Sequence, residues 1–143
     1  MEIPPHLLES VVAHAVRDAP NECCGVVAVR DGVAEAVHPL ENVLEKVPLH
    51  LGFQIDGMAL HRVMTEIEDS GALVGAIYHS HTRSAPYPSQ TDINYAAPEN
   101  GPGWPGTEWL IVGTAGDEPI VRSYLIERQD ESRRVVVTEV ALA

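Results

Sequence analysis

The segment Leu73–His81 reads Leu-Val-Gly-Ala-Ile-Tyr-His-Ser-His. Its first six residues are almost wholly apolar, which is typical of a central β-strand buried on both faces. His79 and His81 then follow two residues apart, and side chains at positions i and i+2 of an extended chain point to the same face. The segment therefore predicts two imidazoles that face one point at the end of a buried strand.

Three other segments have the spacing or the capping pattern of helices. In residues 4–20 and again in residues 57–70 the apolar side chains recur every three or four positions, and Gly71 then stops the second helix. The sequence Ser-Gln-Thr-Asp at 89–92 has the form of a capping box. It predicts a short helix over residues 90–97.

Short apolar segments separated by turn residues predict the remaining strands. Arg30-Asp31-Gly32 has the composition of a hairpin turn, and the prolines and glycines of residues 98–106 predict a surface loop. The predicted strands are residues 24–29, 33–40, 51–55, 109–114, 120–126 and 134–140. This order of elements predicts an α/β fold in which a single domain, residues 1–143, holds a mixed β-sheet flanked by helices.

Length and composition exclude several classes of protein. The 143 residues are enough for one compact domain, and the formal net charge of -12 argues against a nucleic-acid partner. The amino terminus lacks a signal-peptide pattern and no apolar run approaches membrane-spanning length, so we expect a cytoplasmic protein with no membrane attachment. Cys23 and Cys24 are neighbours and are expected to be reduced and packed.

His79 and His81 have the residue type and the geometry to share a zinc ion. Asp92, at the start of the next helix, can add a carboxylate oxygen, and three protein ligands leave a fourth position open for water, as in catalytic zinc sites. Taken separately, the histidines are explained by a polar surface and residues 89–92 by a helix cap. The joint pattern, His-x-His, seven residues, Ser, two residues and Asp, favours a metal site.

This pattern resembles the metal motif of the JAMM, or MPN-plus, metalloproteases, a motif that an upstream Glu completes. The segment 20–25, Pro-Asn-Glu-Cys-Cys-Gly, is similar to the family's Glu-x-Cys-Gly sequence after the first helix, and Glu22 is the matching residue. The resemblance extends from the first helix to about Tyr124. It implies the MPN fold, which is cytidine-deaminase-like.

The resemblance also implies a role for each residue of the motif. His79, His81 and Asp92 would bind one zinc ion. Glu22 would accept a hydrogen bond from the attacking water and shuttle its proton to the leaving amine. Ser89 would donate a hydrogen bond to the developing oxyanion.

One departure from the family narrows the substrate. The eukaryotic deubiquitinating branch usually has Pro after the second His, where this chain has Thr82. The chain looks instead like short bacterial members, some of which act on the diglycine tail of a ubiquitin-like sulfur-carrier protein during cysteine synthesis. The resemblance thus implies a peptidase or isopeptidase that cuts after the carboxy-terminal Gly-Gly of such a carrier and releases cysteine. We expect the tail to lie extended beside a strand edge near His79, with specificity set by loops 44–52 and 98–106.

Other functions stay open at this stage. Another ubiquitin-like protein or a peptide can be the substrate, because the loops that set specificity do not name it. A non-catalytic MPN scaffold is an alternative from another class, although such domains have lost the metal ligands that this chain retains. A zinc deaminase would need His-x-Glu and Pro-Cys-x-x-Cys sequences, and neither occurs here.

Overall fold

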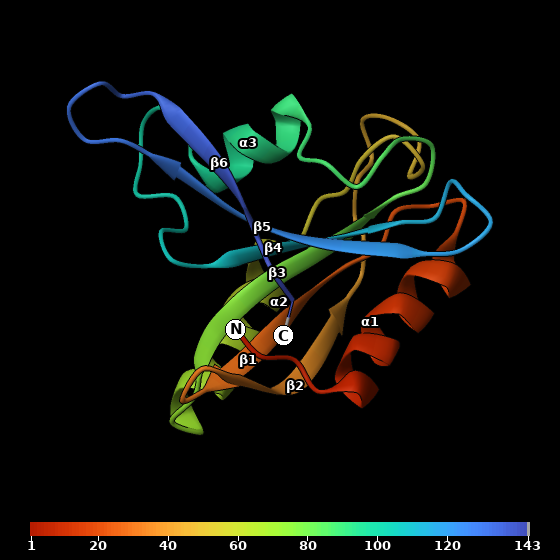
Figure 1. Ribbon diagram of the computed structural model, residues 1–143, viewed down its shortest axis with the longest axis horizontal. Helices are drawn as coiled ribbons and strands as arrows, with labels where there is room; N and C mark the ends of the chain where they lie inside the picture. The colour runs from red at the N-terminus through yellow and green to blue at the C-terminus, as the bar shows by residue number, and fades with distance from the viewer. Residues whose placement is uncertain (143) are drawn as a thin grey trace.

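The computed structural model describes residues 1–142, which form one six-stranded sheet and three helices (Figure 1). In chain order the elements are α1 (Pro5–Asp18), β1 (Cys24–Arg30), β2 (Val33–Leu40), α2 (Gly57–Asp69), β3 (Leu73–His81), α3 (Gln90–Ala96), β4 (Glu108–Gly113), β5 (Ile120–Arg128) and β6 (Val135–Val140). The strand order is β2-β1-β3-β4-β5-β6, with β3 and β4 parallel and every other neighbouring pair antiparallel. The predicted mixed sheet flanked by helices is confirmed.

The helices divide between the two faces of the sheet. Val11 of α1 lies in one core cluster with Tyr78 and Leu110, whereas Ile67 of α2 and Ala96 of α3 lie in the clusters of the other face. Because side chains alternate along β3, its histidines project to the face that carries α2 and α3. The alternation of side chains along β3 therefore places His79 and His81 between the sheet and α3.

The prediction of a central strand over Leu73–Tyr78 is confirmed, and the strand continues to His81. Its residues from Gly75 onward are buried. His79 is paired on one side with Cys24 of β1 and on the other with Ile111 of β4. Since both edges of β3 are occupied, the expectation that a substrate tail adds to the edge beside His79 is wrong.

The predicted strand at residues 51–55 is also wrong. Only Ile55 makes an isolated bridge, to Asn42, and Leu51 is exposed. The apolar pattern predicts a strand, but tertiary packing overrides it, because Phe53 turns inward to a core cluster and the segment pairs with no strand of the sheet. Residues 43–54 form a loop instead, and its Phe53 packs on the core cluster that contains Ile77.

The other boundaries agree with the sequence to within two residues. Gly71 follows α2 with φ of +86°, a left-handed conformation that glycine adopts without steric penalty. The predicted capping box at the start of α3 is present. No helix within residues 1–142 combines the length and the apolar character needed to cross a membrane.

Candidate metal centre

Two elements bring three of the candidate ligands together. His79 and His81 come from the last three residues of β3, and Asp92 comes from the first turn of α3. The capping box fixes Asp92, because its Oδ2 accepts the backbone N–H of Ser89 at 2.9 Å while its own N–H donates to the Ser89 hydroxyl at 3.1 Å. All three side chains are buried, with exposures of 6% or less. A local helix-capping motif thus aims a carboxylate at the end of the central strand.

The three side chains converge through single atoms. The Nε2 atoms of His79 and His81 lie 3.2 Å apart, and Asp92 Oδ2 lies 3.1 Å from the first and 3.0 Å from the second. Zinc bonds to nitrogen and oxygen of about 2.0 to 2.1 Å in a tetrahedral site correspond to ligand separations of about 3.3 Å. The spacing of these atoms therefore fits a small divalent cation.

The hydrogen bonds of His81 favour the same conclusion. Its Nδ1 lies 3.0 Å from the carbonyl oxygen of Ala85, which can only accept a hydrogen bond. The Nδ1 atom therefore carries a proton, and in the neutral ring the Nε2 lone pair is left to face His79 and Asp92. A cation between these acceptors relieves the electrostatic repulsion among them.

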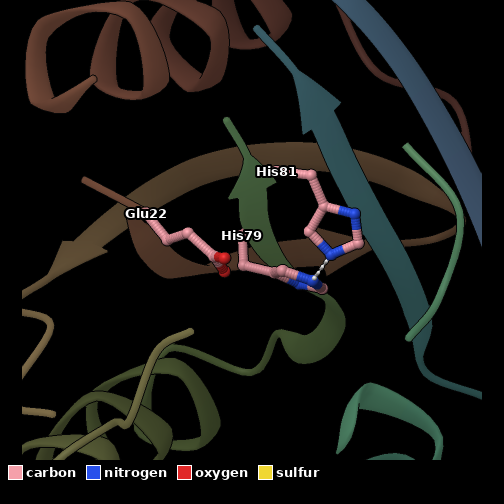
Figure 2. Close-up of side chains that lie close together, drawn as sticks. All are labelled: Glu22, His79 and His81. Carbon is pink, nitrogen blue, oxygen red and sulfur yellow. Dashed lines mark hydrogen bonds between the residues drawn. The ribbon is translucent and has the colours of Figure 1, made fainter. Parts of the chain in front are cut away.

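Glu22 faces the same point from the other side. It precedes β1, is 9% exposed, and its carboxylate lies with the histidine nitrogens in a group whose ligand atoms are all within 4.8 Å of one another. Figure 2 shows the Glu22 carboxylate directed toward the imidazole of His79. Burial, together with the charge of Asp92, raises the pKa of Glu22 to about 7, although the nearby His81 opposes this rise. A carboxyl group with such a pKa can both accept and release a proton near neutral pH.

Burial and hydrogen bonding set the other protonation states. Burial lowers the pKa of His79 and favours its neutral ring. Burial also acts to lower the pKa of His81, but its bonds to Asp92 and the Ala85 carbonyl outweigh that effect and raise it. Burial would raise the pKa of Asp92, whereas hydrogen bonds from both histidines hold it well below the usual range. The site thus combines an ionised Asp92 and a neutral His79 with a His81 that favours an extra proton, and a divalent cation would displace that proton from Nε2 on binding.

Ser89 is the N-cap of α3 and is exposed. Its hydroxyl oxygen accepts the N–H of Asp92, so the hydroxyl hydrogen is free to rotate toward a bound molecule. The structure therefore brings together His79, His81, Asp92 and Glu22, with Ser89 hydrogen-bonded to Asp92 at the N-cap of α3.

Sequence reasoning missed two residues next to the centre. Phe53 stacks on the His79 ring with centroids 4.5 Å apart and an interplanar angle of 26°. It also lines a cavity of about 330 Å³ with Gln54, Ile55 and Asp92. The second missed residue is Asn42, whose side chain bonds to the backbone of Glu22. No sequence motif marks Phe53 or Asn42, because each contacts a residue that is far away along the chain.

Known proteins resemble this chain over most of its length. A family model described as prokaryotic homologs of the JAB domain, Prok-JAB, matches residues 4–134. The CysO-cysteine peptidase of Mycobacterium tuberculosis strain H37Rv is 34% identical over 110 residues, which are 76% of this chain and 69% of that protein. The probable TtuB-protein conjugate cleaving protease of Thermus thermophilus is 36% identical over 135 residues, 94% and 82% of the two chains. The desampylase of Haloferax volcanii is 32% identical over 114 residues, 76% of each chain.

Solved structures share the fold. A protein from Desulfitobacterium hafniense superimposes with a TM-score of 0.74 at 26% identity, over 99% of this chain and 90% of that one. A JAB1/MPN domain protein from Archaeoglobus fulgidus gives a TM-score of 0.57 at 19% identity, over 99% and 96% of the two chains. The family match and the sequence identities settle the classification: this chain belongs to the JAMM metalloprotease family, among the prokaryotic homologs of the JAB domain.

Proposed function

We propose that this protein is a zinc peptidase that hydrolyses the amide bond after the carboxy-terminal Gly-Gly of a ubiquitin-like sulfur-carrier protein. His79, His81 and Asp92 hold one zinc ion, and Glu22 handles the proton. The observation that carries the proposal is the convergence of three buried ligand atoms within 3.2 Å of one another. When bound, zinc polarises the scissile carbonyl and lowers the pKa of the attacking water.

Glu22 carries the proton transfers of the reaction. Its carboxylate accepts the proton of the attacking water and then delivers a proton to the leaving amine, so that the amide nitrogen departs as a neutral amine. A pKa of about 7 matches both steps near neutral pH. Positioned acid–base catalysis of this kind contributes on the order of a hundred to ten thousand fold in rate.

Ser89 stabilises the oxyanion that forms as water adds to the carbonyl. Its hydroxyl oxygen is occupied by the Asp92 N–H, which leaves the hydroxyl hydrogen as donor toward the substrate oxygen. Removal of one such donor lowers the rate by about a hundred to a thousand fold in a well-studied case.

The carrier tail occupies the cavity between the 43–54 loop and α3. This cavity is lined by Phe53, Gln54 and Ile55 from the loop and by Asp92 and Tyr95 from the helix. Phe53 and Tyr95 pack at 6.1 Å between ring centroids and narrow the cavity, which suits residues without side chains. The names of the relatives support a carrier substrate, since they describe action on CysO-cysteine, on TtuB-protein conjugates and as a desampylase.

We further propose that one domain spans the chain and that it works in the cytoplasm. The family match over residues 4–134 supports the first point. Both cysteines are free and buried, as fits a reducing compartment.

The test combines zinc content with two substrates. One is a sulfur carrier with a carboxy-terminal cysteine adduct, and the other is the same carrier joined through an isopeptide bond to a lysine. We expect about one zinc per chain and release of cysteine from the first substrate. If the protein binds zinc but cleaves neither substrate, its substrate is a different one. If it cleaves only the isopeptide-linked carrier, it is an isopeptidase. If it binds no zinc, the scaffold alternative holds.

A further inference from the structure

Glu22 is held in place from two sides through its backbone. The neighbouring Cys23 bonds toward β3, since its N–H donates to the Ser80 hydroxyl at 2.9 Å. The backbone of Glu22 bonds in the opposite direction, where its N–H donates to the Leu49 carbonyl at 2.9 Å and its carbonyl accepts from Asn42 Nδ2 at 3.0 Å. Asn42 and the 43–54 loop therefore fix the position of the Glu22 backbone relative to the candidate metal centre.

Asn42 uses the full hydrogen-bonding capacity of its carboxamide. Its Nδ2 donates to the carbonyls of Glu22 and Gly52, both at 3.0 Å. Its Oδ1 accepts the N–H of Leu44 at 3.2 Å and the N–H of Gln54 at 3.0 Å. Two donated and two accepted bonds are the complete set for this side chain, and no other residue of similar size supplies them.

These bonds connect the proton carrier to the cavity beside the metal centre. Gln54, whose N–H bonds to Asn42, lines that cavity next to Phe53, and the Gln54 carbonyl accepts the N–H of Val43 at 2.9 Å. Resting on the proposed function of Glu22, we propose that Asn42 is a positioning residue. It sets the Glu22 carboxylate relative to the attacking water and keeps it in register with the loop that receives the substrate tail.

The four hydrogen bonds of the Asn42 side chain, here called the Asn42 clamp, matter because proton transfer requires accurate placement of the Glu22 carboxylate. Proton transfer needs heavy atoms within about 2.6 to 3.2 Å, and a displacement of about 1 Å can lower a rate on the order of a hundredfold. The clamp does not touch the three candidate zinc ligands, which belong to β3 and α3. Loss of Asn42 should therefore separate proton transfer from metal binding.

Two variants test the proposal. Asn42→Ala removes all four bonds. Asn42→Asp keeps an oxygen for the Leu44 and Gln54 N–H groups but can no longer donate to the Glu22 and Gly52 carbonyls, so it holds the loop and releases Glu22. Val11→Ala, which truncates a fully buried side chain of α1, serves as a control for loss of stability alone.

We expect both Asn42 variants to keep one zinc per chain and to lose at least tenfold in kcat on the carrier substrate, whereas Val11→Ala stays within twofold of wild type. In a Glu22→Gln background, Asn42→Ala should change the residual rate by less than twofold. Amide hydrogen exchange at Glu22 and Gln54 should accelerate in Asn42→Ala, which gives a readout that needs no turnover.

The outcomes separate this inference from the function on which it rests. If Glu22→Gln abolishes activity while both Asn42 variants retain wild-type kcat, or if exchange at Glu22 is unchanged in Asn42→Ala, Asn42 does not position Glu22. A further tenfold loss in the Glu22→Gln background would show that Asn42 acts elsewhere. Full activity of Glu22→Gln would instead overturn the proposed proton carrier.

Discussion

Glu22 is the residue on which the proposed chemistry depends most directly, and we expect its replacement to leave the three proposed zinc ligands, His79, His81 and Asp92, in place. Its carboxylate faces the centre, but the backbone around it is held by the loop and by β3. Glu22→Gln keeps the shape of the side chain and removes the site for the proton. We expect kcat to fall at least about a hundredfold with unchanged zinc content, measured by single-turnover cleavage and metal analysis.

A matched control for this substitution is Glu35→Gln. Glu35 is an acidic residue of β2 that pairs on the surface with Arg30, away from the metal centre. Its replacement should leave both zinc content and kcat within twofold of wild type. Equal activity in Glu22→Gln and Glu35→Gln would remove Glu22 from the mechanism.

The adjacent thiols of Cys23 and Cys24 should be inert despite their closeness to the site. Burial raises the pKa of Cys23 to about 11 and that of Cys24 to about 12, and the thiolate is the reactive form. At pH 8 both groups therefore stay protonated in the folded protein. Ellman's reagent should label neither within minutes in buffer and both in denaturant; rapid labelling of the native protein would contradict their assignment to packing.

At the scale of elements, the packing of α1 on the sheet depends on a glycine, Gly25 of β1, which lies against the Tyr78 ring of β3. A Cβ on Gly25 would lie 2.3 Å from two ring carbons of Tyr78. Tyr78 is fully buried and its hydroxyl is 2.7 Å from His14 Nδ1, so the ring has no free direction in which to move. Close packing of α1 on the sheet thus requires the absence of a side chain at this position.

Gly25→Ala should destabilise the protein by about 1 to 3 kcal/mol, the range for an overpacked core. Gly57→Ala, at the start of α2, is the control because an added Cβ there meets nothing within 4 Å. We expect it to change stability by less than about 0.5 kcal/mol, as surface substitutions do. Urea unfolding measures both, and equal stabilities would show that Tyr78 yields more readily than its burial suggests.

At the scale of the whole molecule, we expect zinc binding to increase the free energy of unfolding and the Tm. Ligand atoms from β3 and α3 meet at the centre, so a bound ion links the sheet to a helix. Zinc at a hundred times its Kd adds about 2.7 kcal/mol, which raises the Tm of a domain of this size by roughly 5 to 10 °C. We expect EDTA to remove this increment in the wild type.

His81→Ala is the control for that measurement, because it deletes one of the three converging atoms. Its Tm should respond little to zinc or to EDTA, although its absolute Tm can differ from that of the wild type. A wild-type Tm that is independent of zinc would count against a metal centre, and a zinc response that persists in His81→Ala would place the ion elsewhere.

We expect acid to lower the free energy of unfolding through His14, which lies outside the candidate metal centre. Burial lowers the pKa of His14 below 6.5, although Asp18 opposes the shift. Between the folded pKa and 6.5 the unfolded chain binds more protons, so the stability contribution is complete above pH 6.5 and is lost as the pH falls through the folded pKa. The free energy of unfolding, measured by urea titration between pH 5 and pH 7.5, should depend less on pH in His14→Gln than in the wild type.

Local rules made much of the molecule readable from its sequence. Strand alternation aligned His79 with His81, the apolar run before them marked the central strand, and the Ser89–Asp92 capping box located the start of α3. Each of these features depends on residues close in the chain, whose geometry follows from backbone periodicity and capping chemistry. The sequence by itself therefore determined the mixed sheet, the candidate metal ligands and the order of elements apart from the strand expected at 51–55.

Contacts between distant residues decided the rest. Residues 51–55 have a strand-like pattern, yet only the finished sheet shows that no edge is left for them beside β1 and β3. Asn42 bonds to Glu22 across 20 positions, and Phe53 reaches His79 across 26, so neither partner can be deduced from local spacing. Tertiary structure alone set the surroundings of the metal centre, because hydrogen-bond partners and stacking depend on where the chain returns in space.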